Sequence, residues 1–249
     1  MEKIFLVFRR DYREMIMTTA FRIVCIVGVV IVLGLSVGVS VALHLQDWYG
    51  EPEARPLLDF IVGLVIYFLT LMVLLAFTWG FAGIQITKEK VNGNIECLMA
   101  TPLSPGTVMA GKELAVFLPG FVISLAAAVV VLAAVNLTTV LPGWNTFVMP
   151  APALVLGLVS NPLLFSGVLA FIILTSLIGN PDVAIAPSLL VGFGLMVGMP
   201  AGMAAGIIDI TSWSFTGWYT LGAVAFWIVV LFLARRLTRQ NIVLSSRGG

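Results

Sequence analysis

Six long apolar segments limit what this chain can fold into. They cover residues 23–45, 59–87, 114–135, 153–178, 183–208 and 213–234. About 20 apolar residues in a helix are enough to cross the hydrocarbon core of a bilayer, and a helix satisfies its own backbone hydrogen bonds there. The pattern therefore predicts an all-α polytopic membrane protein with six transmembrane helices.

The rest of the chain leaves no room for a second domain. Of the 249 residues, 60% are hydrophobic and 10% are charged, whereas soluble domains carry about 25% charged residues. Because the connections between the apolar segments are short, we expect residues 1–249 to form a single transmembrane domain. The net charge of +1 gives no reason to expect a nucleic-acid partner.

The basic residues predict the orientation of the chain. All but one of the 13 Lys and Arg residues lie before the first apolar segment, between the second and third, or after the sixth. The exception is Arg55. Because Lys and Arg concentrate in cytoplasmic loops, we expect both termini to be cytoplasmic.

Residues 1–22 have the pattern of an amphipathic helix that lies in the inner membrane interface. Its predicted apolar face contains Ile4, Phe5, Phe8, Tyr12, Met15, Ile16 and Thr19. Its predicted charged face contains Lys3, Arg9, Arg10, Arg13 and Glu14. Two interpretations are open: an anchor that sets orientation, and a lever that contacts a cytoplasmic partner and moves the first span.

Residues 106–112 contain most of a phosphate-binding loop, G-x-x-x-x-G-K. Glu113 occupies the position of the Ser or Thr that would hold magnesium. The segment that follows is apolar and long enough to cross a membrane, not the first helix of a soluble α/β domain. We therefore expect the nucleotide site, if there is one, on another chain.

Groups suited to catalysis or metal binding are scarce. The single histidine, His44, lies at a predicted outer membrane edge, and the two cysteines, Cys25 and Cys97, are far apart in the sequence. The H-E-x-x-H and G-x-S-x-G patterns of metalloproteases and hydrolases do not occur. We expect no catalytic, cofactor or metal site on this chain, and hence not an enzyme.

The only sizeable predicted cytoplasmic loop covers residues 88–113. Asn92 or Asn94 is placed to cap a short helix, and Thr101 with Pro102 is placed to end it. Its apolar face would consist of Ile95, Leu98 and Met99. Such a helix needs a surface to pack on, which is either its own bundle or a cytoplasmic partner.

This loop resembles the signature of the type-2 permeases of ATP-binding-cassette transporters, E-[KR]-x-x-G-[ST]-x-E-x-L-x-x-[ST]-P-[LV] followed by a G-K pair. The matching residues are Glu89, Lys90, Gly93, Glu96, Leu98, Thr101, Pro102, Leu103, Gly111 and Lys112. Asn94 stands where the family has Ser or Thr, and all three residue types cap helices. The predicted N-terminal helix and six spans match the family's plan over the whole chain.

The resemblance implies a coupling helix that fits a groove on a separate ATPase subunit, which carries ATP and Mg²⁺. Two permease chains, identical or different, would pair around a central path and export cargo across the plasma (inner) membrane. The coupling residues would be Glu89, Lys90, Gly93, Ile95, Glu96, Leu98, Thr101, Pro102, Gly111 and Lys112. Residues 106–112 would return the chain to the third span, with Lys112 at the inner interface.

No charged residue falls in the middle of a predicted span, since Asp59, Glu113, Asp182 and Asp209 all lie at span ends. Ion-coupled carriers need a polar or charged site near the midplane. The pattern therefore favours a pump driven by a partner, with a hydrophobic, amphipathic or lipid-linked cargo. An ion-coupled secondary carrier, and a membrane scaffold that recruits a cytoplasmic protein without transport, are the alternatives.

Polar side chains within the spans are few. The candidates for polar contact with cargo are Thr70, Thr78, Ser124, Asn161, Ser166 and Thr175. Asn161 directly precedes Pro162. Its amide is expected either to satisfy the carbonyl that proline leaves free or to face a polar path.

Four glycines in the fifth apolar segment, Gly194, Gly198, Gly202 and Gly206, recur every four residues and form a bare stripe along one helix face. Small residues at this spacing let helices approach closely. We therefore expect helix packing at this stripe, either as a static contact or as a surface that slides between two states.

Overall fold

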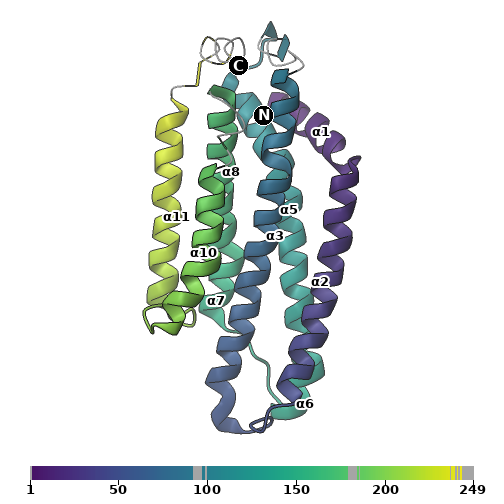
Figure 1. The fold of residues 1–249 in the computed structure, drawn as a ribbon, viewed down its shortest axis with the longest axis vertical. Coiled ribbons are helices and arrows are strands. Elements are labelled where there is room, and N and C mark those ends of the chain that lie inside the picture. Colours follow the sequence, from purple (N-terminus) through teal and green to yellow (C-terminus); the bar gives the residue numbers. More distant parts are fainter. Residues whose placement is uncertain are drawn as a thin grey trace.

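The computed structural model describes residues 2–91, 97–98, 100–178, 184, 186–235, 237–238, 240 and 242, with the backbone alone for residues 83–91. In this part of the chain every regular element is a helix, and six helical stretches are long and apolar enough to cross a membrane. Figure 1 shows them as an elongated bundle. Within the described residues, the predictions of an all-α fold and of six helices able to span a membrane are confirmed.

The helices follow the predicted segments closely. The spans are α2 (Thr19–His44), α3 (Arg55–Val91), α5 (Pro105–Val135), α7 (Ala151–Val155) with η3 (Leu156–Ser160) and α8 (Asn161–Ile178), α10 (Ala186–Ala204) and α11 (Trp213–Ala234). Shorter helices are α1 (Glu2–Ile16), η1 (Pro52–Ala54), η2 (Asn136–Val140) and α6 (Leu141–Trp144). Hydropathy alone therefore locates each span to within a few residues, except at the start of α5.

Helix caps explain why α2 and α5 begin before their apolar segments. Thr18 Oγ1 accepts a hydrogen bond from the backbone N–H of Phe21, and Ser104 Oγ accepts one from Thr107, each at 3.2 Å. These bonds satisfy backbone donors that the start of a helix leaves free. Pro105 follows Ser104, where its fixed φ angle suits a first helical position.

Two of the spans contain a π-helical turn. One is η2, between α5 and α6, and the other is η3, between α7 and α8. Pro142 and Pro162 each lie in the first two residues of the α-helix after such a turn. Proline has no N–H to give to the preceding turn, and a wider turn accommodates that loss without ending the helix. The hydropathy pattern contains no signal for these turns.

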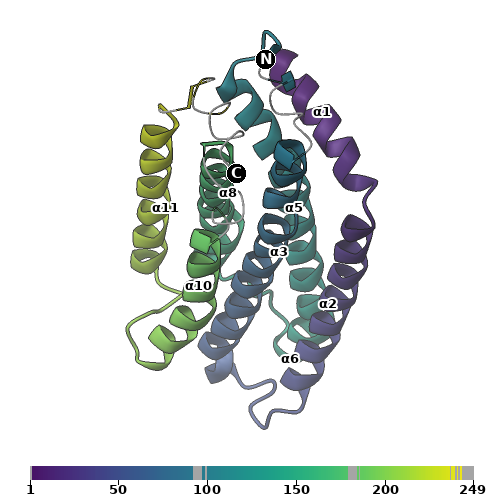
Figure 2. The same ribbon diagram turned by 45° about the horizontal axis from the view of Figure 1, so that its top comes forward.

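Three helices form the centre of the bundle. In the most apolar 18 residues of each span, the buried share is 72% for the stretch with α8, 56% for the one with α3 and 44% for the one with α5, against 6% in α2 and 11% in α11. Figures 1 and 2 show α2, α10 and α11 on the outside of the bundle. Many of their apolar side chains are exposed, as expected for contact with lipid or with another chain.

The two ends of the bundle differ in construction. One end, called here the α1 end, holds α1, the start of α5 and the end of α11. At the opposite end Asn136 is buried, and its side chain exchanges hydrogen bonds of 2.7 and 3.1 Å with the backbone of Val148. This amide joins η2 to the irregular segment before α7.

Residues 205–212, between α10 and α11, form a turn and no helix. Gly206 ends α10 with a φ angle of 69°, and the N–H groups of Ile207 and Ile208 both donate to the carbonyl of Gly202. Asp209 Oδ1 then accepts hydrogen bonds from the backbone and hydroxyl of Thr211. The connection is too compact to enter the membrane as a separate element.

Candidate functional site

The first helix is a separate unit that turns sharply into the first span. α1 ends at Ile16, and Thr18 Oγ1 donates a 2.6 Å hydrogen bond to the carbonyl of Met15 while it caps α2. Residues 1–22 are therefore not one helix, and Thr19 belongs to α2 and not to an apolar face of α1. The bond pattern at Thr18 links the two helices directly.

α1 packs against α5 through a row of side chains that only partly overlaps the predicted apolar face. Val7, Asp11 and Met15, spaced four residues apart, are its buried residues, whereas Phe5 is 60% exposed. Of the predicted apolar face, Met15 is buried, and Tyr12 and Ile16 pack on the same apolar cluster. Sequence reasoning missed Val7 because Asp11 interrupts its row. The side of the helix that carries Arg9 and Arg13 is exposed and can face the membrane surface or a partner.

Gly111 allows the close approach of α1 to α5. A Cβ atom at this position would lie 2.6 Å from Cβ of Val7 and 3.2 Å from the carbonyl oxygen of Ile4. Cβ atoms do not come this close in folded proteins, so any larger residue would push the two helices apart. This contact gives the glycine of the predicted G-K pair a structural role.

Lys112 forms a buried ion pair with Asp11. Its Nζ atom lies 2.9 Å from Oδ2 of Asp11, and the two side chains are 2% and 1% exposed. Nε of Arg10 lies 2.8 Å from the other carboxylate oxygen, on the outer side of the pair. Two charges removed from water are tolerated only when they are paired and hydrogen-bonded with good geometry, so this pair fixes α1 to α5 in one register.

The phosphate-loop pattern is not a loop. Residues 105–112 are helical and form the first turns of α5. Lys112 is directed at Asp11 and not into a phosphate-sized opening. Gly106 and Gly111 both lie within this helix, so the stretch does not form the glycine-rich loop that cradles a phosphate.

The end of the predicted loop also contacts α1. Thr101 donates from its backbone N–H at 3.2 Å and from its hydroxyl at 2.6 Å to the carbonyl of Leu98. Leu98 packs on the apolar cluster that contains Met15, and Lys3 Nζ donates to the carbonyl of Pro102 at 3.4 Å. Residues 97, 98 and 100 are helical and 101–104 are not, in agreement with the predicted helix stop.

The first half of the motif is described less fully. Glu89 and Lys90 lie in the last turn of α3, where only the backbone is described. The remaining motif residues and caps, Asn92, Gly93, Asn94, Ile95, Glu96 and Met99, lie outside the described residues. Their assignment as coupling residues stays a prediction.

The glycine stripe packs no helix against another within the described chain. A Cβ atom at Gly194, Gly198 or Gly206 would meet nothing within 4 Å, and at Gly202 the nearest atoms belong to Ile208 in the turn after α10. The close contact of α10 is made instead at Gly192, against the side chains of Leu75 and Trp79 on α3. Packing of the stripe against a second chain stays a prediction.

Asn161 connects three helices in the bundle interior. Its Nδ2 atom donates to Thr70 Oγ1 at 3.1 Å and to the carbonyl of Tyr67 at 3.3 Å, both on α3. Its Oδ1 atom accepts a 2.8 Å hydrogen bond from the hydroxyl of Tyr219 on α11. Neither sequence expectation is met, because the amide serves packing between helices and not the helix break at Pro162.

The other predicted polar contacts are occupied within the bundle. The hydroxyl groups of the remaining five residues donate to carbonyls three or four positions earlier in their own helices: Thr70, Thr78, Ser124, Ser166 and Thr175. Four of the five side chains are buried and Thr175 is half-buried. These groups therefore do not line an open path through this single chain.

The described part of the chain buries few charged side chains. Among the described residues the buried charged groups are Asp11 and Lys112, both at the α1 end. No group of three His, Cys, Asp or Glu residues in this part of the chain is placed to hold a metal ion.

Comparison with models of protein families, with curated proteins and with solved structures found no match. The resemblance to type-2 permeases therefore rests on the loop motif and on the six-span plan of the sequence.

Proposed function

We propose that this chain is the transmembrane permease subunit of an ATP-binding-cassette exporter. It would form a dimer in the plasma (inner) membrane, with both termini cytoplasmic, and would couple to separate ATPase subunits that hold ATP and Mg²⁺. Its own contribution would be the membrane path for a hydrophobic, amphipathic or lipid-linked cargo.

The observation that carries this proposal is that three residues of the loop motif contact α1. Gly111 and Lys112, the G-K pair, contact Val7 and Asp11, and Pro102 contacts Lys3. These residues are about 100 positions apart in the sequence. A motif that only recruited a protein would not need such contacts, whereas a coupling element needs a firm connection to the spans.

The contacts supply a path for motion from the loop to the membrane. A partner that displaces the predicted loop would move α5, because the last residues of that loop, 105–113, are the first turns of α5. The ion pair of Lys112 with Asp11 then carries α1 along, and the Thr18 turn passes the motion to α2. This path favours the lever interpretation of α1 over a passive anchor.

The lack of buried charge near the middle of the described spans favours a partner protein as the source of energy for transport. In the described spans no carboxylate, histidine or basic group is buried near the middle of the bundle, where an ion-coupled carrier needs a site for its ion. The buried polar network around Asn161 is made of neutral groups that bond to one another. These features support ATP-driven transport over the secondary carrier.

The exposed helices are suited to a dimeric permease. α2, α10 and α11 leave most of their apolar residues exposed, and the expected polar cargo contacts are used inside the single chain. A cargo path is therefore better placed between two chains, with lipid covering the remaining apolar surface.

Purification of the tagged chain from its native host in mild detergent tests the proposal. We expect an ATP-binding-cassette subunit to co-purify with ATPase activity, and both to be lost in Glu96→Lys while the permease stays in the membrane. Glu53→Lys reverses an exposed charge in η1, at the opposite end of the bundle, and is the matched control.

Two results would contradict the proposal. The chain purified alone, under conditions that preserve other membrane complexes, together with transport that collapses with an ion gradient, would favour the secondary carrier. A complex that contains an ATPase but shows neither cargo-stimulated hydrolysis nor transport would favour the scaffold.

A further inference from the structure

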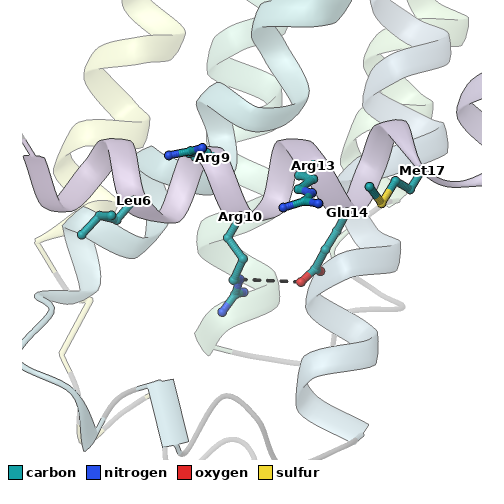
Figure 3. Close-up of a pocket in the computed structure, with 6 residues that line it drawn as sticks. All are labelled: Leu6, Arg9, Arg10, Arg13, Glu14 and Met17. Atoms are coloured by element: carbon teal, nitrogen blue, oxygen red, sulfur yellow. Dashed lines mark ion pairs between the residues drawn. The ribbon is translucent and has the colours of Figure 1, made fainter.

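α1 carries a basic groove on the side that does not face α5. The groove has a volume of about 500 Å³ and is lined by Leu6, Arg9, Arg10, Arg13, Glu14 and Met17. Figure 3 shows Arg9 and Arg13 on one side of the α1 ribbon and Arg10 with Glu14 on the other. Three guanidinium groups and one carboxylate give the groove a positive balance.

The three arginines are not equivalent. Nε of Arg10 lies 2.8 Å from Asp11 and 3.9 Å from Glu14, so its guanidinium group is already paired with carboxylates of its own helix. Arg9 and Arg13 are four residues apart and lie on one face, and within the described chain neither of them forms an ion pair. These two side chains are the ones placed to bind an anion.

The neighbouring surface favours an anion that carries an apolar tail. Leu6 is 65% exposed and Met17 is 60% exposed, and Met17 lies in the turn between α1 and α2. Beyond this turn, Ile23, Ile26 and Val27 continue as an exposed apolar surface along α2. A soluble acidic protein would match the charges but not this apolar continuation.

We propose that Arg9 and Arg13 bind the phosphate of an anionic phospholipid whose acyl chains lie along the exposed face of α2. Guanidinium groups bind phosphate through paired, charge-assisted hydrogen bonds, and basic residues next to a span attract anionic lipid headgroups. The site would hold the Arg9 face of α1 at headgroup level while Asp11 and Lys112 hold the opposite face to α5.

This proposal rests on the placement of the α1 end at a membrane surface, which is part of the proposed function, but not on transport or on an ATPase. Native mass spectrometry of the full chain in neutral detergent tests it without a partner. The protein is titrated with phosphatidylglycerol and, separately, with phosphatidylcholine that has the same acyl chains.

We expect phosphatidylglycerol to bind more tightly than phosphatidylcholine. A basic residue near an anionic surface contributes about 1 kcal/mol, which is about fivefold in affinity. Arg9→Gln and Arg13→Gln should each weaken phosphatidylglycerol binding about fivefold, and the double variant about 25-fold, with phosphatidylcholine binding unchanged. Arg55→Gln removes an exposed charge at the opposite end and should leave both affinities unchanged.

Three results would overturn the proposal. The first is phosphatidylglycerol affinity in the double variant equal to that of the unmodified chain. The second is equal affinity of the unmodified chain for the two lipids. The third is displacement of phosphatidylglycerol by millimolar inorganic phosphate or by an acidic peptide, which would indicate a site for a soluble anion or for a protein. Failure of the ATPase to co-purify would leave these readings unaffected.

Discussion

The ion pair of Asp11 with Lys112 gives the sharpest test of how α1 is held. At a separation of 2.9 Å, two unit charges attract by about 6 kcal/mol at an effective dielectric constant of about 20, and the desolvation of both groups offsets part of this. Removing one member of a buried pair costs about 3 kcal/mol. We expect Asp11→Asn to lower the free energy of unfolding by about that amount.

The partner substitution should cost less. In Lys112→Met the carboxylate of Asp11 keeps the guanidinium of Arg10 at 2.8 Å, and Arg10 is 43% exposed, so the remaining charge is not stranded. We expect a loss of about 2 kcal/mol. The double variant Asp11→Asn/Lys112→Met removes both charges and should lose less than the sum of the two single losses.

Unfolding by SDS in mild detergent micelles, followed by circular dichroism, measures these differences. Glu14→Gln is the matched control because Glu14 is 66% exposed and lies 3.9 Å from Arg10, so a change within about 0.5 kcal/mol is expected. Losses that are strictly additive in the double variant, or an Asp11→Asn variant as stable as the Glu14→Gln control, would refute the reasoning.

Two further substitutions test the packing of the bundle. Gly111→Ala should lower the free energy of unfolding by about 1 to 3 kcal/mol because the added Cβ atom would overlap Val7. Gly106→Ala is the control and should not destabilise the chain, because its Cβ atom would meet nothing within 4 Å. Equal effects of the two substitutions in the same SDS titration would contradict the close contact. Asn161→Leu should lower the free energy of unfolding by about 1 to 3 kcal/mol because it leaves buried partners without their hydrogen bonds. An unchanged titration midpoint would contradict the role of Asn161 in connecting the three helices.

The spans were predictable because each depends on its own residues. An apolar segment of about 20 residues has to be a helix if it crosses a bilayer, and no distant contact changes that outcome. The helix starts at Thr19 and Pro105 are earlier than the apolar segments suggest, but their caps, Thr18 and Ser104, are visible in the sequence.

The contacts at the candidate site were not predictable in the same way. Asp11 and Lys112 are 101 positions apart, and Asp11 lies in a run of basic residues that suggests a solvated helix face. Only the packing of α1 on α5 brings the two charges together. The same holds for Asn161, whose partners are on α3 and α11.

Glycine spacing illustrates the difference between pattern and contact. Gly194 and Gly198 have the spacing of a packing stripe, but a Cβ atom at either would meet nothing within 4 Å in the described chain, whereas Gly111 and Gly192 lie outside any such stripe and make close contacts. A bare helix face permits close packing, but the neighbouring helix decides where the packing occurs. The whole fold decides which helix is the neighbour. For the glycine stripe, we expect that neighbour in a second chain.

The most direct test of the central claim is a crosslink from the predicted coupling loop in native membranes. Cys97 is exposed and lies next to Leu98 in the helical part of the loop, so it accepts a short photoactivatable thiol crosslinker without further mutation. Cys97→Ser is the control for labelling at Cys25. The account predicts that Cys97 is crosslinked to an ATP-binding-cassette ATPase subunit and that Glu96→Lys abolishes the product. Crosslinks only to the chain itself, in membranes where the ATPase is present, would contradict it.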